Sequence, residues 1–328
     1  MFYCVDSTTD NPFFNLAAEE YLLHNKRDDF VLFYVNRPSI IIGKHQNVFR
    51  EVNRSFLKRN PVPVVRRLTG GGTVWHDHGN LNFSFILNGE QGKVVDFGKY
   101  IKPVVAFINS LNIPAGTDKR NNILIHETKI SGNAEYVYKH RILHHGTLLF
   151  DTNLKDLKEA LLPNPEEISD KAVSSQPSGV TNIKKYLKET TDLPEFRKKL
   201  KEYCLDYFAP CRIYTLTKSE EQEIEKLIRE KYNTWAWNIA YSPPCVLTRS
   251  LLLSGMEIPA NISLKNGKIH EISFPKNAEL PEEIFILARF FSGFPYEKEA
   301  VERALDPLWK KEKVSIISQG EWIRFLFG

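Results

Sequence analysis

Three consecutive glycines at positions 70–72 constrain the fold of this chain more than any other feature, because segments with the pattern of β-strands flank them. Residues 64–69 read Val-Val-Arg-Arg-Leu-Thr, and residues 81–85 alternate apolar and polar side chains. Each glycine costs roughly 0.5–1 kcal/mol relative to alanine in a regular element, so three together indicate unusual dihedral angles or close approach of a ligand. Free amides in such a loop can bind an anion. The segment therefore predicts an anion-binding loop, with a glycine turn between strands and two surface arginines as the alternative.

Two common nucleotide-binding patterns do not fit this loop. The chain contains no Gly-x-x-x-x-Gly-Lys-Ser/Thr segment, and glycines 70–72 lack the Gly-x-Gly-x-x-Gly spacing. The segment instead resembles the lipoate-protein ligase family, whose motif is Arg-Arg-x-x-Gly-Gly-Gly-x-Val-x-His-Asp. The matching residues of this chain are Arg66, Arg67, Gly70, Gly71, Gly72, Val74, His76 and Asp77.

Two earlier segments follow the order of the same family. Residues 11–20, Asn-Pro-Phe-Phe-Asn-Leu-Ala-Ala-Glu-Glu, resemble its first helix, in which Asn11 can be the cap and Pro12 the first helical residue. The apolar face predicted to lie in the core consists of Phe13, Leu16, Ala17 and Tyr21. Residues 31–47 read as two apolar strands around a proline turn and end in the family's Gly-x-x-Gln-Asn, whose polar end we expect to face the ligand.

A lysine in the next matching segment is the first candidate for catalysis. Residues 129–134, Lys-Ile-Ser-Gly-Asn-Ala, are similar to the family's Lys-x-Ser-Gly-x-Ala, and residues 143–149 to its His-His-Gly-Thr-Leu-Leu. Short β-rich runs at 123–125 and 142–150 predict that Lys129 projects from a sheet. A lysine taken at random is a solvated surface charge, so the motif, and not composition, singles out Lys129.

The resemblance implies a two-step acyl transfer. ATP converts lipoate to lipoyl-AMP with release of pyrophosphate, and a lysine of an acceptor domain then displaces AMP. Fixed positive charge and amide donors are needed where negative charge develops. The residues expected to bind ATP and lipoyl-AMP are Arg66, Arg67, Gly70, Gly71, Gly72, Thr73, Val74, Trp75, His76, Lys129, Ser131, Gly132 and Ala134. The lipoate pocket candidates are Arg66, Gly71, His76, His145 and Gly146, while Val74, Trp75 and Phe85 could equally be pocket wall or core.

The resemblance also implies cofactors and partners. ATP is expected with Mg²⁺, which phosphate oxygens and waters would largely hold, so no dedicated protein metal site is predicted. The expected acceptors are apo lipoyl domains of 2-oxoacid dehydrogenase complexes and the glycine-cleavage carrier protein. Neither a nucleic acid nor a membrane is an expected partner. The adjacent histidines leave a metal site open as an alternative.

Three departures from the family pattern concern activation. The usual Arg-Asn-Asp reads Arg120-Asn121-Asn122, which removes a carboxylate. The adenylate-covering loop, commonly Ser-Val-Arg-Ser-Arg-Val-x-Asn, has lost both arginines at 174–182, where Gln176 and Gly179 stand, and Ala240 replaces a glycine. A lipoyltransferase that uses preformed lipoyl-AMP, with weak or no activation activity, is therefore the alternative function.

Composition places these motifs in an ordinary globular protein. The net charge of +4 is mixed along the chain rather than concentrated in a basic stripe, and 42% of the residues are hydrophobic. No apolar run reaches the roughly 18 residues of a membrane span, and the N-terminal residues lack a signal-peptide pattern, so a cytoplasmic location is expected. The four cysteines have no Cys-x-x-Cys spacing, as expected of reduced structural thiols.

We expect two domains. Residues 1–243 are predicted to form an α/β (α+β) catalytic domain of the biotin/lipoate ligase type, with a mixed, mostly antiparallel sheet, and residues 244–328 a small α+β accessory domain. Residues 151–235 look mainly helical, and the tail holds strands at 246–253, 258–264 and 269–274, followed by helices at 282–291 and 297–305.

Other classes are weaker. An octanoyl transferase would need a cysteine near Lys129, but Cys204, Cys211 and Cys245 lie outside the matched segments and Cys4 stands at the start of the chain. A biotin ligase would carry a different arginine-glycine loop. A non-catalytic lipoate-binding module would not need Lys129 and both arginines.

Overall fold

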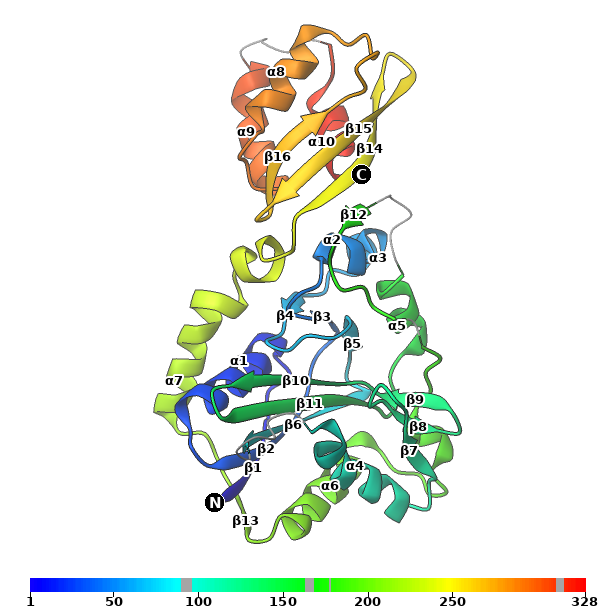
Figure 1. Cartoon of the computed structure of the whole chain (residues 1–328), viewed down its shortest axis with the longest axis vertical. Helices are drawn as coiled ribbons and strands as arrows, with labels where there is room; N and C mark the ends of the chain where they lie inside the picture. The colour runs from blue at the N-terminus through cyan, green and yellow to red at the C-terminus, as the bar shows by residue number, and fades with distance from the viewer. Residues whose placement is uncertain (90–95, 163–167, 177, 311–315) are drawn as a thin grey trace. The chain divides into compact units, whose positions relative to one another are not determined.

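The computed structural model describes residues 1–89, 96–162, 168–176, 178–310 and 316–328. The chain divides into two compact units (Figure 1). Unit 1 comprises Met1–Gln46, Glu51–Leu162 and Ser174–Thr234, and unit 2 comprises Asn47–Arg50, Pro163–Val173 and Trp235–Gly328. That two short segments of the first half of the chain belong to unit 2 was not predicted. The functional boundary between residues 243 and 244 stays a prediction.

Unit 1 is built on a six-stranded sheet with the order β10-β11-β6-β2-β1-β13. Its strands are β1 (Phe2–Asp6), β2 (Asp29–Val35), β6 (Asn80–Asn88), β10 (Asn133–Tyr138), β11 (Arg141–Leu149) and β13 (Cys211–Ile213). Pairing is antiparallel from β10 to β2 and parallel from β2 through β1 to β13. The prediction of a mixed, mostly antiparallel sheet is confirmed. Edge strand β13 lies in a region predicted to be mainly helical.

Helices cover both faces of this sheet (Figure 1). One face carries α1 (Pro12–Asn25), which Asn11 caps through its side chain as predicted, and the other carries α4 (Phe97–Ser110) and α6 (Leu193–Tyr207). Strand β6 is consequently buried on both faces, including Asn82 and Ser84. The alternation of β6 separates an apolar face in the core from a polar face near α1.

Two small sheets hold the matched motifs. The first has the order β4-β3-β5 and the second β7-β8-β9. Their strands are β3 (Ser39–Ile42), β4 (Val64–Arg66), β5 (Val74–His76), β7 (Ala115–Thr117), β8 (Ile123–Ile125) and β9 (Thr128–Ser131). The remaining elements of unit 1 are α3 (Arg54–Arg59), α5 (Leu154–Ala160), η1 (Ile183–Tyr186), α7 (Lys218–Leu227) and η2 (Ile228–Tyr232). The three glycines thus join β4 to β5, and the candidate lysine lies in β9.

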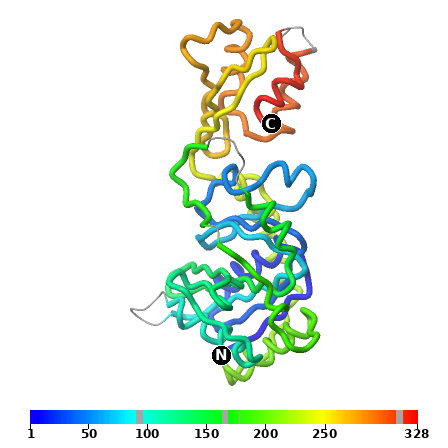
Figure 2. Tube along the Cα trace, turned by 90° about the vertical axis from the view of Figure 1, so that its right-hand side faces the viewer, coloured from blue at the N-terminus to red at the C-terminus, as the bar shows by residue number. Residues whose placement is uncertain are grey.

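Unit 2 packs helices on a four-stranded antiparallel sheet with the order β12-β14-β15-β16. Figure 2 shows β12, in green, beside the yellow β14. The elements are α2 (Val48–Glu51), which begins in this unit, β12 (Ile168–Asp170), η3 (Ala236–Ala240), β14 (Cys245–Leu253), β15 (Met256–Lys265), β16 (Lys268–Ser273), α8 (Glu282–Phe290), α9 (Lys298–Lys310) and α10 (Gln319–Phe327). The three strands and first two helices predicted for the tail are confirmed, whereas α10 was missed although Trp322 is fully buried in the core.

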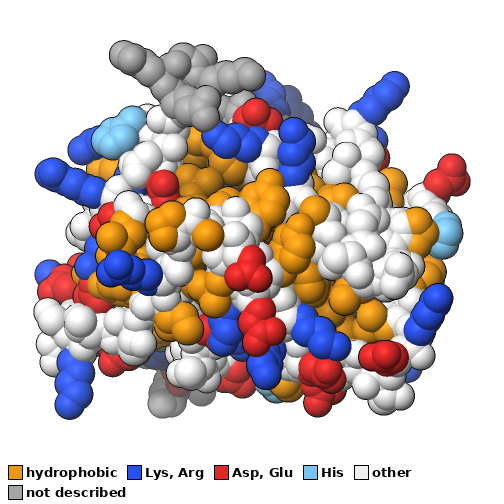
Figure 3. All heavy atoms as spheres, turned by 90° about the horizontal axis from the view of Figure 1, so that it is seen from below, with side chains coloured by type: hydrophobic (Ala, Val, Ile, Leu, Met, Phe, Trp, Pro, Cys, Tyr) orange, Lys and Arg blue, Asp and Glu red, His pale blue; other side chains and the backbone are white. Residues whose placement is uncertain are grey.

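The mixture of charges on the surface and the character of the helices agree with the composition of the chain. On the face shown in Figure 3, basic and acidic side chains are interspersed among apolar ones. Among the described residues, none of the helices combines the length and the apolar character that a membrane crossing requires.

Candidate functional site

The glycine loop is organised by the buried guanidinium of Arg67. Its Nη2 donates to the carbonyl oxygens of Gly70 at 2.6 Å and Gly72 at 2.7 Å, and its Nη1 donates to Ile41 O at 3.1 Å. Burial lowers the pKa of Arg67 to about 10, so the side chain stays charged at neutral pH. Arg67 binds the carbonyl groups of the loop and thereby fixes the loop conformation. The N–H groups of the loop are left to bind other acceptors.

The loop amides are available for an anion. In the described part of the chain, the N–H groups of Gly70, Gly71 and Gly72 donate to no protein acceptor. Gly71 has a φ of 84°, a conformation that favours glycine. A Cβ placed on Gly43 would lie 2.1 Å from Gly71 O, so the backbone of residue 43 touches the loop directly. The loop therefore has N–H groups without a protein acceptor among the described residues, and its binding of an anion stays a prediction.

Arg66 has different surroundings from Arg67. It is fully buried, and its Nη1 donates to the carbonyl oxygens of Gly43 at 3.0 Å, Lys44 at 3.1 Å and Gln46 at 2.7 Å. These bonds hold the 43–46 turn against β4. The predicted contact of Arg66 with nucleotide and lipoate stays a prediction, whereas its support of the turn is a finding.

Lys129 lies on β9 beside the 174–182 segment. Its backbone N–H donates to Gly179 O at 3.1 Å and its carbonyl accepts from Thr181 N–H at 3.0 Å. Its Nζ lies 3.0 Å from the position that a Cβ on Gly132 would take, so this glycine leaves room for the lysine side chain. Burial lowers the pKa of Lys129, attraction to Asp118 opposes that effect, and the charges of Arg120 and Arg67 add to it. Arg67 and Lys129 thus contribute positive charge to one region.

The buried carboxylate of Glu19 is linked to the glycine loop by hydrogen bonds. The sequence had predicted this residue only as part of the first helix. Glu19 is 1% exposed and accepts hydrogen bonds from three side chains, namely Tyr34 at 2.9 Å, Ser84 and His145 Nδ1 at 3.1 Å. His145 Nε2 lies 2.8 Å from Thr69 Oγ1, which in turn accepts from Arg67 Nε at 2.9 Å. A hydrogen-bonded chain therefore links Glu19 to Arg67. A glutamate among the apolar residues of a helix was the signal that could have revealed it.

The segment that lacks the family's two arginines is fastened to the glycine loop by Ser175. Its Oγ accepts from Thr73 N–H at 2.9 Å and from Gln46 Nε2 at 3.0 Å, and it donates to Glu51. Gln46 Oε1 also accepts from Thr73 Oγ1 at 2.8 Å and from Gly43 N–H at 3.0 Å. This network explains why the Gly-x-x-Gln-Asn motif lies beside the loop. Glu51 was missed because only the tertiary structure brings α2 near residue 175.

The other predicted site residues differ in their hydrogen bonding and packing. His76 is buried, its Nδ1 lies 2.9 Å from Asn36 Nδ2, and burial lowers its pKa to about 3, so the ring is neutral. Ser131 Oγ is buried and has no hydrogen-bond partner within the described residues. Trp75 donates to Asp77 Oδ2 at 3.1 Å and packs edge-on against Phe56, which indicates a structural role. Two further predicted residues have close neighbours: Ala134 lies near Gly71, and Gly146 lies against Phe83 and Asn133.

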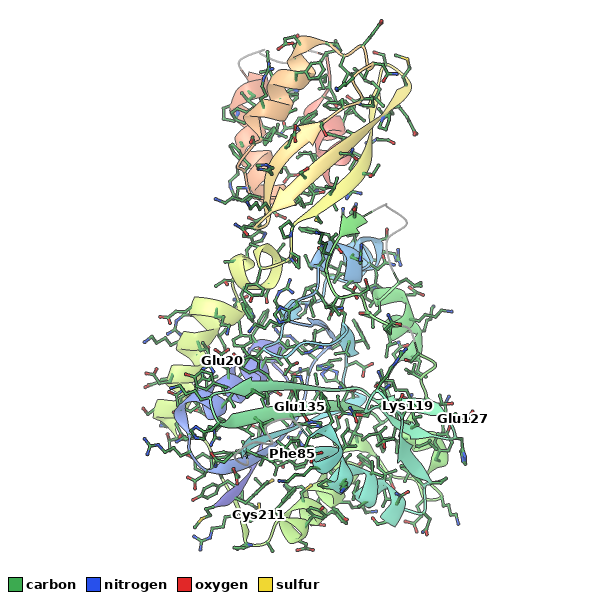
Figure 4. The ribbon with its side chains drawn as sticks, in the orientation of Figure 1. Glu20, Phe85, Lys119, Glu127, Glu135 and Cys211 are labelled. Atoms are coloured by element: carbon green, nitrogen blue, oxygen red, sulfur yellow. The ribbon has the colours of Figure 1, made fainter. Side chains whose placement is uncertain are left out.

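Phe85 lies in the main core of unit 1 and not beside the loop. Its ring stacks at a tilt on Phe208 with centroids 5.6 Å apart, and it is fully buried (Figure 4). Of the two roles left open for this residue, the structure therefore supports the core.

His144 and Glu135 form a buried pair of titratable side chains on the face of β10 and β11 that is opposite to His145. His144 Nδ1 is 2.9 Å from Glu135 Oε1, with side-chain exposures of 0% and 3%. Burial, with a smaller effect from Asp96, raises the pKa of Glu135 to about 7, and burial lowers that of His144 to about 3. His144 is therefore neutral at neutral pH, whereas Glu135 is only partly protonated. Figure 4 labels Glu135 on the large sheet.

Replacing Glu135 with glutamine is expected to stabilise the protein at alkaline pH. At pH values between 4.5, its ordinary pKa, and about 7, Glu135 keeps its proton in the native state but releases it in the unfolded chain. The free energy of unfolding therefore falls as the pH rises through this range. Glu135→Gln removes this loss, and its free energy of unfolding should exceed that of the wild type by about 2 kcal/mol at pH 8. Urea unfolding at pH 4.5 and pH 8 measures it.

The exposed Glu127 provides the matched control, since Glu127→Gln should leave the pH dependence unchanged. Equal effects of Glu135→Gln at both pH values would show that the buried pair does not titrate in this range.

Metal and cysteine chemistry have little support in the side-chain arrangement. Among the described residues, no group of three or more His, Cys, Asp and Glu side chains could hold a metal ion. Cys4, Cys204 and Cys211 form no disulfide, and burial raises the pKa of Cys4 to about 12 and also raises those of Cys204 and Cys211. These thiols are therefore protonated and poor nucleophiles.

Comparison with known proteins supports the motif match. Residues 11–205 match the model of the family described as the lipoyl protein ligase A/B catalytic domain. Lipoate–protein ligase 1 of Staphylococcus aureus is 34% identical over 99% of this chain and 100% of that protein.

Solved structures give the same result for the fold. A bipartite lipoate protein ligase from Thermoplasma acidophilum, described with its E2 lipoyl domain, has a TM-score of 0.62 and 26% identity, covering 72% of this chain and 95% of that chain. A lipoate-protein ligase A bound with ATP has a TM-score of 0.60 and 25% identity, covering 72% and 97%. The prediction of a lipoate ligase catalytic fold is confirmed. With the glycine loop, Arg67 and Lys129 in the same unit, these matches show that the chain belongs to the lipoyl protein ligase A/B family.

Proposed function

We propose that this protein is an ATP-dependent lipoate–protein ligase that forms lipoyl-AMP and transfers the lipoyl group to a lysine of acceptor lipoyl domains. The observation that carries the proposal is the arrangement around the glycine loop, where Arg67 binds the loop carbonyls, the amides of Gly70, Gly71 and Gly72 are available, and Lys129 is near enough to interact with Arg67. We expect it to act in the cytoplasm.

In the first step a lipoate carboxylate oxygen attacks the α-phosphorus of ATP, the new C–O–P link forms, and pyrophosphate leaves with the electron pair. Two anions must meet, so the charges of Arg67 and Lys129 and the loop amides lower the barrier. In the second step the acceptor amine attacks the carbonyl carbon, a C–N bond forms, AMP leaves, and the amine loses a proton. Lys129 within hydrogen-bond reach of the carbonyl and phosphate oxygens would stabilise the charge that develops.

Mg²⁺ is part of the proposal only as a companion of ATP. We expect phosphate oxygens and water molecules to hold most of its coordination positions. Acceptors are proposed to be lipoyl domains of 2-oxoacid dehydrogenase complexes and the glycine-cleavage carrier protein; the E2 lipoyl domain studied with the Thermoplasma ligase supports the first class.

The test separates the two steps. Pyrophosphate release is measured with ATP, Mg²⁺ and lipoate but no acceptor, and apo lipoyl domain is then added and its intact mass determined. We expect release followed by a mass increase of one lipoyl group. Attachment from supplied lipoyl-AMP without pyrophosphate release would instead identify a lipoyltransferase, and neither activity would reject the proposal.

A further inference from the structure

Glu19 is surrounded by hydrogen-bond donors on one face of the large sheet. Ser84 of β6 and His145 of β11 are direct partners in the strand register, so their side chains lie on the same face. Glu19 Oε1 accepts from Tyr34 at 2.9 Å and from Ser84. His145 Nδ1 lies 3.1 Å from both carboxylate oxygens. A carboxylate only accepts and can satisfy all three donors, whereas an amide in its place would bring a donor of its own.

The carboxylate of Glu19 determines which ring nitrogen of His145 carries the proton. Because the carboxylate can only accept, Nδ1 is the nitrogen that donates to it. Nε2 of the neutral ring is then an acceptor, and it lies 2.8 Å from Thr69 Oγ1. The Thr69 hydroxyl donates to Nε2, and its oxygen accepts from Arg67 Nε at 2.9 Å. Since all four side chains are buried, water does not replace these bonds.

The opposite tautomer would change how the glycine loop is held. With its proton on Nε2, His145 would donate to Thr69, and the Thr69 hydroxyl could turn to Gly70 O, which lies 3.3 Å from Oγ1. This carbonyl oxygen already accepts from Arg67 Nη2 at 2.6 Å. Thr69 and Arg67 would then donate to the same oxygen, which weakens the bond through which Arg67 holds the loop.

We propose that Glu19 is a positioning residue for Arg67, which acts by fixing His145 as the Nδ1–H tautomer. Thr69 orients the planar guanidinium through Nε, so that Nη2 meets the carbonyl oxygens of Gly70 and Gly72. The inference rests on the proposed ligase function, because its effect on catalysis is exerted through the conformation of the glycine loop.

The tautomer of His145 gives a readout that a purely structural role of Glu19 would not move. The protein is labelled with ¹⁵N-histidine, the ring nitrogens are observed by NMR at about pH 8, where an ordinary histidine is neutral, and His145→Gln assigns the signal. We expect protonated Nδ1 and unprotonated Nε2 in the wild type. Glu19→Gln keeps the size of the side chain but can donate from its amide, and it should move the proton to Nε2. Its kcat/KM for pyrophosphate release from ATP and lipoate should fall on the order of tenfold, the effect of losing one hydrogen bond to a charged group.

Glu20→Gln is the matched control. Glu20 is the next residue of α1, it is also buried, and its Oε2 accepts from a tyrosine, Tyr232, at 2.7 Å (Figure 4). It accepts from Lys231 Nζ at 2.6 Å as well, so these two partners lie in η2. We expect Glu20→Gln to leave the His145 tautomer and kcat/KM unchanged.

Thr69→Val separates the tautomer from its effect on Arg67. The variant lacks the hydroxyl between His145 and Arg67 but keeps Glu19, so Nδ1 should stay protonated while kcat/KM falls as in Glu19→Gln. The double variant should be no slower than either single variant, because both substitutions interrupt the same chain.

A proton on Nε2 of His145 in the wild type would overturn the proposal, as would wild-type kinetics of Thr69→Val or additive losses in the double variant. If Glu19→Gln does not fold, the wild-type spectrum and Thr69→Val still decide. If the wild type neither releases pyrophosphate nor transfers the lipoyl group from supplied lipoyl-AMP, the ligase function fails. The spectra of the wild type and Glu19→Gln then still show whether Glu19 sets the tautomer.

Discussion

Replacing Lys129 with alanine is expected to reduce lipoyl transfer about 10³-fold, the effect of removing one donor that stabilises charge in an acyl transfer. The side chain is partly buried, and the charges of Arg67 and Arg120 repel it while that of Asp118 attracts it. A bound anion would offset the repulsion by the two arginines. Transfer from supplied lipoyl-AMP, read by intact mass of the acceptor, isolates the second step. Pyrophosphate release measures the first step, in which Lys129 is expected to act as well.

Lys119 provides the matched control, because it is an exposed lysine in the adjoining turn (Figure 4). Lys119→Ala should transfer at the wild-type rate. Lys129→Arg should not rescue activity, because a planar guanidinium on a longer side chain does not place its donors where the compact ammonium of lysine lies. A Lys129→Ala variant with unchanged transfer would favour a binding module over an enzyme.

Replacing Gly43 with alanine is expected to damage both stability and activity. The added Cβ would lie 2.1 Å from Gly71 O and 3.1 Å from Gly71 C, so backbone and not a movable side chain must shift. We expect the free energy of unfolding to fall by about 3 kcal/mol, the upper end of the usual cost of overpacking. A loop displaced by about 1 Å should also lower kcat/KM on the order of 100-fold. Denaturant unfolding and steady-state kinetics measure the two effects.

Gly116→Ala is the matched control for this prediction. A Cβ on Gly116 meets no atom within 4 Å, so the variant should keep the stability and the activity of the wild type. If Gly43→Ala behaved like Gly116→Ala, the close contact between the 43–46 turn and the glycine loop would not exist in solution.

Local patterns in the sequence were sufficient for most elements and for the centre of the candidate site. The cap at Asn11, the proline after it and the alternation of residues 246–253 act within a few residues, so α1 and β14 were predictable. The sequence predicted a site at glycines 70–72, Arg67 and Lys129 because each of their motifs is contiguous in the chain. The boundaries of unit 2 were not predicted, because residues 47–50 and 168–173 join it through contacts distant in sequence, such as Asn47 Nδ2 to Asp170 Oδ2 at 2.9 Å.

The sequence by itself determined most of the strands and helices, and its contiguous motifs singled out the glycine loop and Lys129 as the candidate site. Only the tertiary structure decided which polar groups support them: Glu19 reaches Arg67 through His145 and Thr69, and Ser175 hydrogen-bonds to Thr73 and Glu51. A buried polar group must find hydrogen-bond partners or lose stability, and folding brings those partners from segments far apart in the chain. No local pattern of residues records such pairings, and for that reason the supporting residues appear only in the folded molecule.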